Sequence, residues 1–146
     1  MLILPLKVII AVLFSALAFY SYAHSGATGL VKERMDNFKE SKRSMKLMKN
    51  AIKENDHSLV ALESEKLVRW GEVMHTYFPE GSNQKPSEAL PIIWQEWSIF
   101  EEHRVEYLQQ AQALMRSAES QDMDDIKSRY GLVAKSCKSC HERYKD

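Results

Sequence analysis

Apolar side chains recur at intervals of three and four residues along four stretches of this chain, and this spacing is typical of amphipathic α-helices. The stretches run from about residue 29 to 55, from 59 to 77, from Pro91 to about 118, and from the acidic cluster at 122–125 to Tyr144. The alternation typical of β-strands is not sustained anywhere. The pattern therefore predicts four helices of similar length.

The spacing also predicts which side chains face inward on the first two helices. On the first helix the expected inward positions are Val31, Met35, Phe38, Met45, Met48 and Ile52. On the second helix they are Leu59, Leu62, Leu67, Trp70, Met74 and Tyr77. Asp56 or Ser58 is expected to cap the second helix, and Thr28 is a possible cap for the first. Four helices with short connections predict an all-α fold, an antiparallel up-down-up-down four-helix bundle.

The first 23 residues have the features of a secretory signal peptide. A short start containing Lys7 precedes an apolar run from Val8 to Tyr20, and a small-x-small ending follows at 21–23. We expect cleavage after Ala23, which leaves residues 24–146 as one domain, exported and with no stable membrane insertion. An uncleaved membrane anchor is the alternative.

The charge balance bears on possible partners. The chain has 20 Lys and Arg against 20 Asp and Glu, and removal of Lys7 with the signal leaves it close to neutral. A nucleic-acid-binding protein is expected to carry a clustered basic face and an excess of positive charge. We therefore do not expect a nucleic-acid partner.

The sequence Cys137-Lys-Ser-Cys140-His141 contains both cysteines of the chain. Cys-x-x-Cys-His is the attachment site of c-type haem. Two thiols three residues apart on a helix lie on the same side, so both can form thioethers with one porphyrin. The histidine can supply an imidazole nitrogen to the iron. The motif thus predicts one covalently bound haem c.

Three other interpretations of the cysteine pair stay open. A thioredoxin-like redox pair should open a helix within an α/β pattern, which is absent here. A structural zinc site needs four ligands, and no second pair of Cys or His has matching spacing. The third is a plain disulfide. Each would make the protein a non-haem, exported helical protein with thiol or disulfide chemistry.

The position of the motif resembles the plan of the cytochrome c′ family, in which Cys-x-x-Cys-His stands near the C-terminus of an exported four-helix chain. Residues 31–34 (Val-Lys-Glu-Arg) resemble the first-helix motif of that family. Residues 78–82 (Phe-Pro-Glu-Gly-Ser) resemble the end of its second helix, and residues 91–94 (Pro-Ile-Ile-Trp) the start of its third. The resemblance spans the whole mature chain.

The resemblance implies a role for several residues of this sequence. Cys137 and Cys140 would hold the haem, and His141 would be the sole protein ligand to the iron. Arg34 would pair with a haem propionate. Glu88 would make a further contact at the haem edge, as would Met35.

The residue one turn after the arginine, Phe38, would lie over the distal face of the iron. A phenyl ring cannot coordinate a metal, so Phe38 favours a five-coordinate iron behind an apolar lid. The alternative is a low-spin, six-coordinate iron with Met35 as sixth ligand, typical of an electron carrier. Lys145, four residues after His141, falls where the family commonly has a basic residue, often arginine, or else it is a solvated tail residue.

The family is associated with nitric oxide binding and with electron transfer in the bacterial periplasm. We therefore expect a periplasmic haem protein that binds NO and CO and carries one electron to or from periplasmic redox partners. The family also implies a homodimer formed through the first two helices. No Ser-His-acid arrangement, phosphate loop or carboxylate pair is recognisable, so we do not expect an enzyme.

Overall fold

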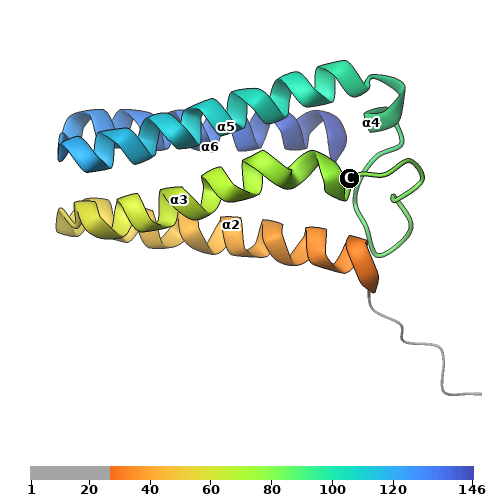
Figure 1. Ribbon diagram of the computed structural model, residues 1–146, viewed down its shortest axis with the longest axis horizontal. Coiled ribbons are helices and arrows are strands. Elements are labelled where there is room, and N and C mark those ends of the chain that lie inside the picture. Colours follow the sequence, from red (N-terminus) through yellow and green to blue (C-terminus); the bar gives the residue numbers. More distant parts are fainter. Residues whose placement is uncertain (1–26) are drawn as a thin grey trace, which may run out of the picture.

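Four long helices carry the chain back and forth along one axis (Figure 1). The computed structural model describes residues 27–146, so the expected signal peptide at 1–23 lies outside the described residues. The elements are α2 (Gly29–Glu54), α3 (His57–Val73), the 3₁₀ turn η2 (Met74–Tyr77), α4 (Ile92–Gln95), α5 (Trp97–Ser120) and α6 (Met123–Tyr144). None of the described helices is long and apolar enough to cross a membrane.

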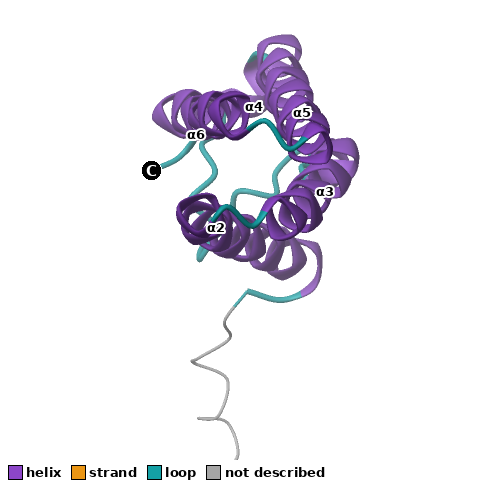
Figure 2. Ribbon diagram, turned by 90° about the vertical axis from the view of Figure 1, so that its left-hand side faces the viewer, coloured by secondary structure: helices purple, strands orange, loops and turns teal. Residues whose placement is uncertain are grey.

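The helices form an up-down-up-down bundle, which confirms the predicted all-α fold. Seen end-on, α2 and α6 lie on one side of the bundle and α3 and α5 on the other (Figure 2). Packing is extensive between α2 and α3, between α3 and α5, and between α5 and α6. By contrast, α2 and α6 touch at only a few positions. This sparsely packed α2–α6 boundary is where the predicted haem motif lies.

Helix ends follow the expected capping chemistry. Asn55 adopts a left-handed conformation (φ 55°) and ends α2, and the Asp56 side chain accepts a hydrogen bond from the Leu59 N–H at the start of α3. Asp122 caps α6 by accepting hydrogen bonds from the backbone N–H groups of the second and third residues after it. Thr28 stands at the start of α2 but makes no side-chain capping bond.

The prediction of one continuous third helix is wrong in one respect, because the structure divides this stretch into two helices. A helix running on from Pro91 was expected, but the chain leaves helical geometry at Glu96 (φ −130°, ψ 46°), between α4 and α5. Two tertiary contacts hold the break. The Glu96 carboxylate pairs with Arg143 of α6, and the Trp94 indole N–H donates to the Phe78 carbonyl at 2.9 Å. Contacts between distant segments here override the local helical pattern.

The predicted inward faces of α2 and α3 are also partly wrong. The buried side chains of α2 include Arg34 and Ser44 beside Met48, whereas Leu62 of α3 is 52% exposed and its neighbour Glu63 is buried. The hydrophobic pattern missed this because the two helices meet partly through polar groups. Apart from a few buried serines, the rest of the core is apolar, and its largest fully buried members are Phe100, Met48, Leu67, Ile93 and Leu114.

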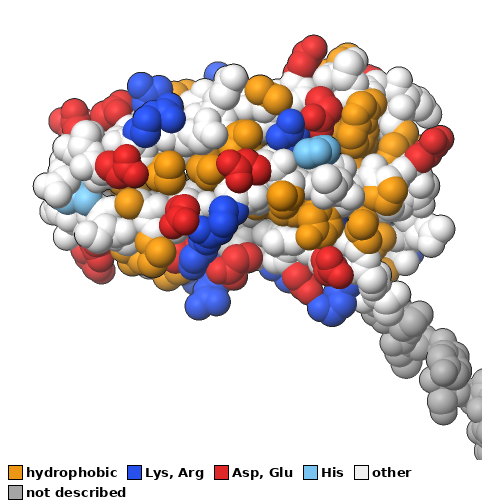
Figure 3. All heavy atoms as spheres, in the orientation of Figure 1, with side chains coloured by type: hydrophobic (Ala, Val, Ile, Leu, Met, Phe, Trp, Pro, Cys, Tyr) orange, Lys and Arg blue, Asp and Glu red, His pale blue; other side chains and the backbone are white. Residues whose placement is uncertain are grey.

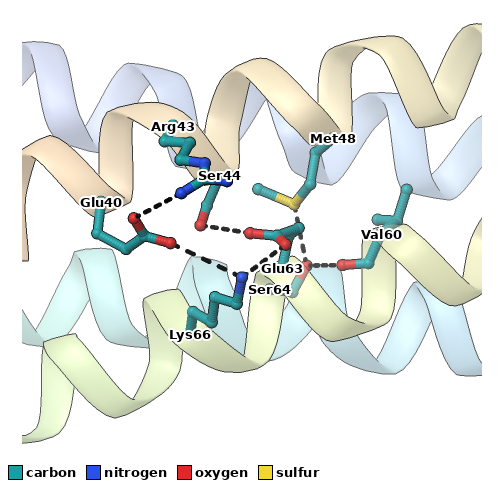
Figure 4. A network of polar contacts seen from close by, with 8 residues as sticks. All are labelled: Glu40, Arg43, Ser44, Met48, Val60, Glu63, Ser64 and Lys66. Carbon is teal, nitrogen blue, oxygen red and sulfur yellow. Dashed lines mark hydrogen bonds and ion pairs between the residues drawn. The ribbon is translucent and has the colours of Figure 1, made fainter.

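A buried carboxylate joins α2 to α3 (Figure 4). Glu63 accepts hydrogen bonds from the Ser44 hydroxyl (2.6 Å) and from the Lys66 ammonium (2.7 Å), and Lys66 also lies 3.7 Å from Glu40. Burial raises the pKa of Glu63, but these two hydrogen bonds outweigh it and hold the pKa below its usual 4.5. The Glu63 side chain is therefore charged at neutral pH and fixes the register of the two helices.

Candidate functional site

The Cys-x-x-Cys-His motif occupies the last two turns of α6. Cys137 and Cys140 are half-buried and pack against the core, while His141 reaches the surface. Across the α2–α6 boundary, the His141 ring stands edge-on to the ring of Phe38, with centroids 6.2 Å apart. The structure thus brings together the two residues that the family resemblance places on opposite faces of the iron.

The electrostatics of the thiols bear on the thiol-exchange alternative. Burial raises the pKa of Cys137, and burial together with the neighbouring Cys137 raises the pKa of Cys140 to about 11. Both side chains are thiols rather than thiolates at neutral pH. A redox-active pair needs a lowered thiol pKa, because the thiolate is the nucleophile. The site therefore lacks the feature that a thioredoxin-like pair requires.

The imidazole of His141 is neutral in this environment. Partial burial lowers its pKa, the positive charge of Lys145 lowers it further, and Glu88 acts in the opposite direction. A neutral imidazole has a free nitrogen lone pair and is the form that ligates a metal. Lys138, Glu142, Lys145 and Asp146 surround His141 in an open surface depression. Among residues 27–146, no group of three or more His, Cys, Asp or Glu side chains is placed to hold a metal ion.

An aromatic cluster surrounds Phe38 on the opposite side. The Phe38 ring stands edge-on to Trp70 (centroids 5.2 Å apart) and to Phe78 (6.4 Å). Met35 is half-buried on the same helix, and it is not among the described side chains that pack against the core. Phe38 is therefore the α2 side chain that faces His141.

One buried polar atom in this cluster has no partner. The indole Nε1 of Trp70 is buried, and no hydrogen-bond acceptor lies within reach of it among the described residues. An unpaired buried donor is costly and rare in folded proteins. A carboxylate-bearing group inserted beside Phe38 would supply the missing acceptor. Together with the sparse α2–α6 packing and the thiol and imidazole donor set, this orphan donor fits a haem c.

Arg34 is buried at the base of the loop that follows η2. Its terminal nitrogens donate to the Tyr77 carbonyl (2.9 Å), to the hydroxyl (2.8 Å) and carbonyl (2.6 Å) of Ser82, and to the Ser87 hydroxyl (2.8 Å). The guanidinium also stacks over the Phe78 ring at 4.4 Å. All four terminal N–H groups thus hold the loop. The expected pairing of Arg34 with a propionate stays a prediction, for which the Nε–H is the donor still available.

The C-terminal residues are fastened against the segment before α4. Lys145 pairs with Glu88 at 2.6 Å, and two backbone hydrogen bonds join residues 88–90 to residues 144–146. The family resemblance placed Glu88 at the haem edge. The structure places its carboxylate next to Lys145 and close enough to His141 to influence the imidazole charge.

A second ion pair in this region escaped the sequence analysis. Arg143, two residues after His141, makes a two-pronged contact with Glu96, one arm of which measures 2.7 Å. The partner holds the pKa of Glu96 down to about 2. The two residues are 47 positions apart, so no local pattern could have joined them. Together with the Lys145–Glu88 pair, this contact fixes the helical turn that carries His141.

A four-helix bundle with a haem-attachment motif on its last helix defines a class of c-type haem proteins. The chain matches the family model described as Cytochrome C′ over residues 29–145. It therefore belongs to the cytochrome c′ family, whose members bind haem c.

Known relatives share this fold. Cytochrome c′ of Alcaligenes xylosoxydans is 28% identical over 65 residues, which is 44% of this chain and about half (51%) of that relative. Cytochrome c prime from Shewanella frigidimarina superposes with a TM-score of 0.74 and 27% identity, covering 80% of this chain and 94% of that one. A ferrous variant of the protein from Alcaligenes xylosoxidans, solved with bound NO, gives a TM-score of 0.72 at 23% identity, covering 80% and 93%.

Proposed function

We propose that this chain is a haem c protein with a five-coordinate iron that binds small uncharged diatomics, NO and CO, and carries one electron. Cys137 and Cys140 would hold the haem through thioethers, and His141 would be its only protein ligand. When bound, the haem supplies an iron with one open coordination position and a reversible ferrous–ferric couple. The observation that carries this proposal is the Phe38 ring facing His141 across the α2–α6 boundary.

The side chains around that open position determine what can enter. Phe38, Trp70 and Phe78 present carbon surfaces, and a phenyl ring has no lone pair to give to a metal. An apolar pocket disfavours anions and water, because a charge or dipole loses its hydration on entry. Small uncharged ligands lose the least hydration free energy when they enter. The NO bound to the Alcaligenes xylosoxidans variant supports the same ligand class for this chain.

The alternative with Met35 as sixth ligand would make the protein a low-spin electron carrier. Phe38 rather than Met35 stands opposite His141 in this structure, and this supports the five-coordinate state.

The proposal also covers the setting of the protein. We propose that residues 1–23 are removed by cleavage and that the mature protein lies in the periplasm, where it meets periplasmic redox partners. It would form a homodimer through the first two helices, and its role would be ligand binding rather than enzymatic.

The test is the optical spectrum of the reduced protein, matured in a periplasm, before and after addition of CO. We expect covalently bound haem with broad high-spin bands that sharpen with CO. Sharp low-spin bands unmoved by CO would mean that Met35 or another side chain fills the sixth position. A correctly matured protein without covalent haem would overturn the proposal altogether.

Phe38→Met is the matched variant for this test. It places a thioether on the side chain that faces His141, so we expect low-spin bands and loss of the CO response. Phe38→Leu keeps an apolar side chain without a ligating atom and should retain the high-spin spectrum.

A further inference from the structure

Lysines form a continuous stripe along the outer face of α2. They recur in steps of three and four residues, which places them on one side of the helix, away from its buried residues. All are exposed, and they span about 20 Å at about 1.5 Å per residue. This lysine stripe consists of Lys39, Lys42, Lys46, Lys49 and Lys53.

Most of the stripe carries charge that the protein does not neutralise. Lys39 lies 3.4 Å from Asp36 at one end. The other four lysines take part in none of the ion pairs formed within residues 27–146. Acidic side chains of α2 lie on its other flank, where Glu40 reaches Lys66 of α3. The stripe is therefore a band of positive charge.

The stripe runs beside the boundary at which the haem motif lies. Phe38 faces His141 of α6, and the Met45 carbonyl accepts a hydrogen bond from the Tyr130 hydroxyl of α6 at 3.0 Å. Lys42 stands one helical turn from both Phe38 and Met45, and side chains three and four residues apart on a helix are neighbours. A molecule resting on the stripe would thus lie next to the α2–α6 boundary.

Charge is segregated across the whole bundle. The α2 helix has eight Lys and Arg against four Asp and Glu, and α6 has five against three. By contrast, α3 and α5 together have four against seven. On the α3–α5 face, acidic, basic and hydrophobic side chains are interspersed (Figure 3). A chain with no net charge therefore has a basic half, and that half carries the haem motif.

We propose that the lysine stripe is the docking surface for an acidic electron-transfer protein. The inference rests on the proposed function, because the electron exchanged is that of the haem. One electron passes from the reduced partner to the ferric haem, so the partner is oxidised by one electron and the iron reduced by one. No bond or proton is transferred. Complementary charge steers such encounters and raises association rates by about 10- to 1,000-fold at low salt.

Two other occupants fit the stripe less well. Helices that lie in a membrane surface need large apolar side chains beside their basic ones, and the only exposed large hydrophobic residue of α2 is Leu30, in its first turn. A second copy of this chain docked on the stripe itself by a two-fold axis would set lysines against lysines, so the proposed homodimer would use the surface of α2 and α3 outside the stripe. Charge complementarity therefore favours an acidic protein.

The test uses the haem-loaded protein and a small acidic [2Fe–2S] ferredoxin of plant type as the probe. The triple variant Lys42→Glu/Lys46→Glu/Lys49→Glu reverses the middle of the stripe. We expect the wild type to bind the ferredoxin at low ionic strength in calorimetry, with an affinity that falls as salt rises. The variant should bind at least 10-fold more weakly. Carbodiimide cross-links to ferredoxin carboxylates should map to lysines of the stripe.

The matched control makes the same change of charge elsewhere, with Arg69→Glu/Lys85→Glu/Arg116→Glu at three exposed positions. At high salt this control should bind the ferredoxin within about twofold of the wild type. At low salt it should retain most of the wild-type affinity. Equal losses in the two triple variants would overturn the proposal, because net charge alone would then explain them.

Further outcomes separate the alternatives. Stripe-dependent binding to phosphatidylglycerol vesicles without ferredoxin binding would overturn the proposal in favour of a membrane surface. A change of oligomeric state in the stripe variant alone, seen by ultracentrifugation, would overturn it in favour of a second copy. Absence of covalent haem in the optical spectrum would overturn the proposed function. Normal haem content with equal ferredoxin binding by the wild type and the stripe variant would overturn the docking proposal but leave the proposed function intact.

Discussion

Replacing Arg34 by methionine removes the four hydrogen bonds that hold the loop after η2 while keeping an unbranched side chain in the buried space. Hydrogen bonds to a charged group contribute about 1.5–3 kcal/mol each, so four give about 6–12 kcal/mol as an upper bound. Two effects reduce this value. Burial of the guanidinium is itself unfavourable and lowers the pKa of Arg34, and acceptors freed in a surface loop can bind water. We expect a loss of about 3–5 kcal/mol, a large part of the total stability of a small domain.

The assay is urea unfolding of the haem-loaded protein at neutral pH, followed by far-ultraviolet circular dichroism. The loss should appear as a lower midpoint with an unchanged denaturant slope. Arg43→Met on the same helix is the control. Arg43 is exposed and only 3.8 Å from Glu40, so its loss should cost less than about 1 kcal/mol.

An Arg34→Met variant as stable as Arg43→Met would refute this account of the loop. If such a variant also showed an altered reduction potential, the arginine would act on a haem propionate instead, as the family resemblance implies. Arg34→Lys should recover little of the lost stability, because one ammonium cannot reach acceptors arranged for a planar fork.

Three further predictions concern single side chains. The pKa of Glu63 is lower in the folded than in the unfolded state, because hydrogen bonds from Lys66 and a buried serine outweigh burial. Its contribution to stability is therefore present above pH 4.5 and lost as pH falls further, so Glu63→Gln should flatten the decline in melting temperature below that pH. Glu96→Gln removes the partner of Arg143 and should speed hydrogen exchange of the last backbone amides several-fold; unchanged exchange would contradict the role given to this pair. Trp70→Phe removes the unpaired indole N–H but keeps a ring, and should lower the reduction potential, measured by spectroelectrochemistry, if that N–H faces a haem carboxylate. An unchanged potential would show that it does not.

The sequence was sufficient for the features that depend on neighbouring residues. Helical periodicity predicted the four long helices, and the cap candidate Asp56 and the acidic cluster at 122–125 predicted where two of them begin. The haem motif was recognised because all of its parts lie within five residues. Each of these features is set by spacing along one element.

Features that join distant elements could not be predicted in the same way. Arg34 and Ser44 interrupt the apolar stripe of α2, yet they are buried because their partners come from the next helix and its loop. The break at Glu96 depends on Arg143 of another helix. The family resemblance, rather than periodicity, placed Phe38 opposite the proximal histidine.

The sparse contact between α2 and α6 also bears on the order in which the fold is completed. Three of the four neighbouring helix pairs pack extensively, and the fourth closes the ring with few contacts of its own. A chain without its cofactor can thus assemble most of its core while the first and last helices stay loosely joined. A haem bound at the motif on α6 would then supply the surface that α2 lacks. Haem binding and the final step of folding would then coincide, and a protein without haem would be left with a loosely packed α2–α6 boundary at which unfolding, and proteolysis, would begin.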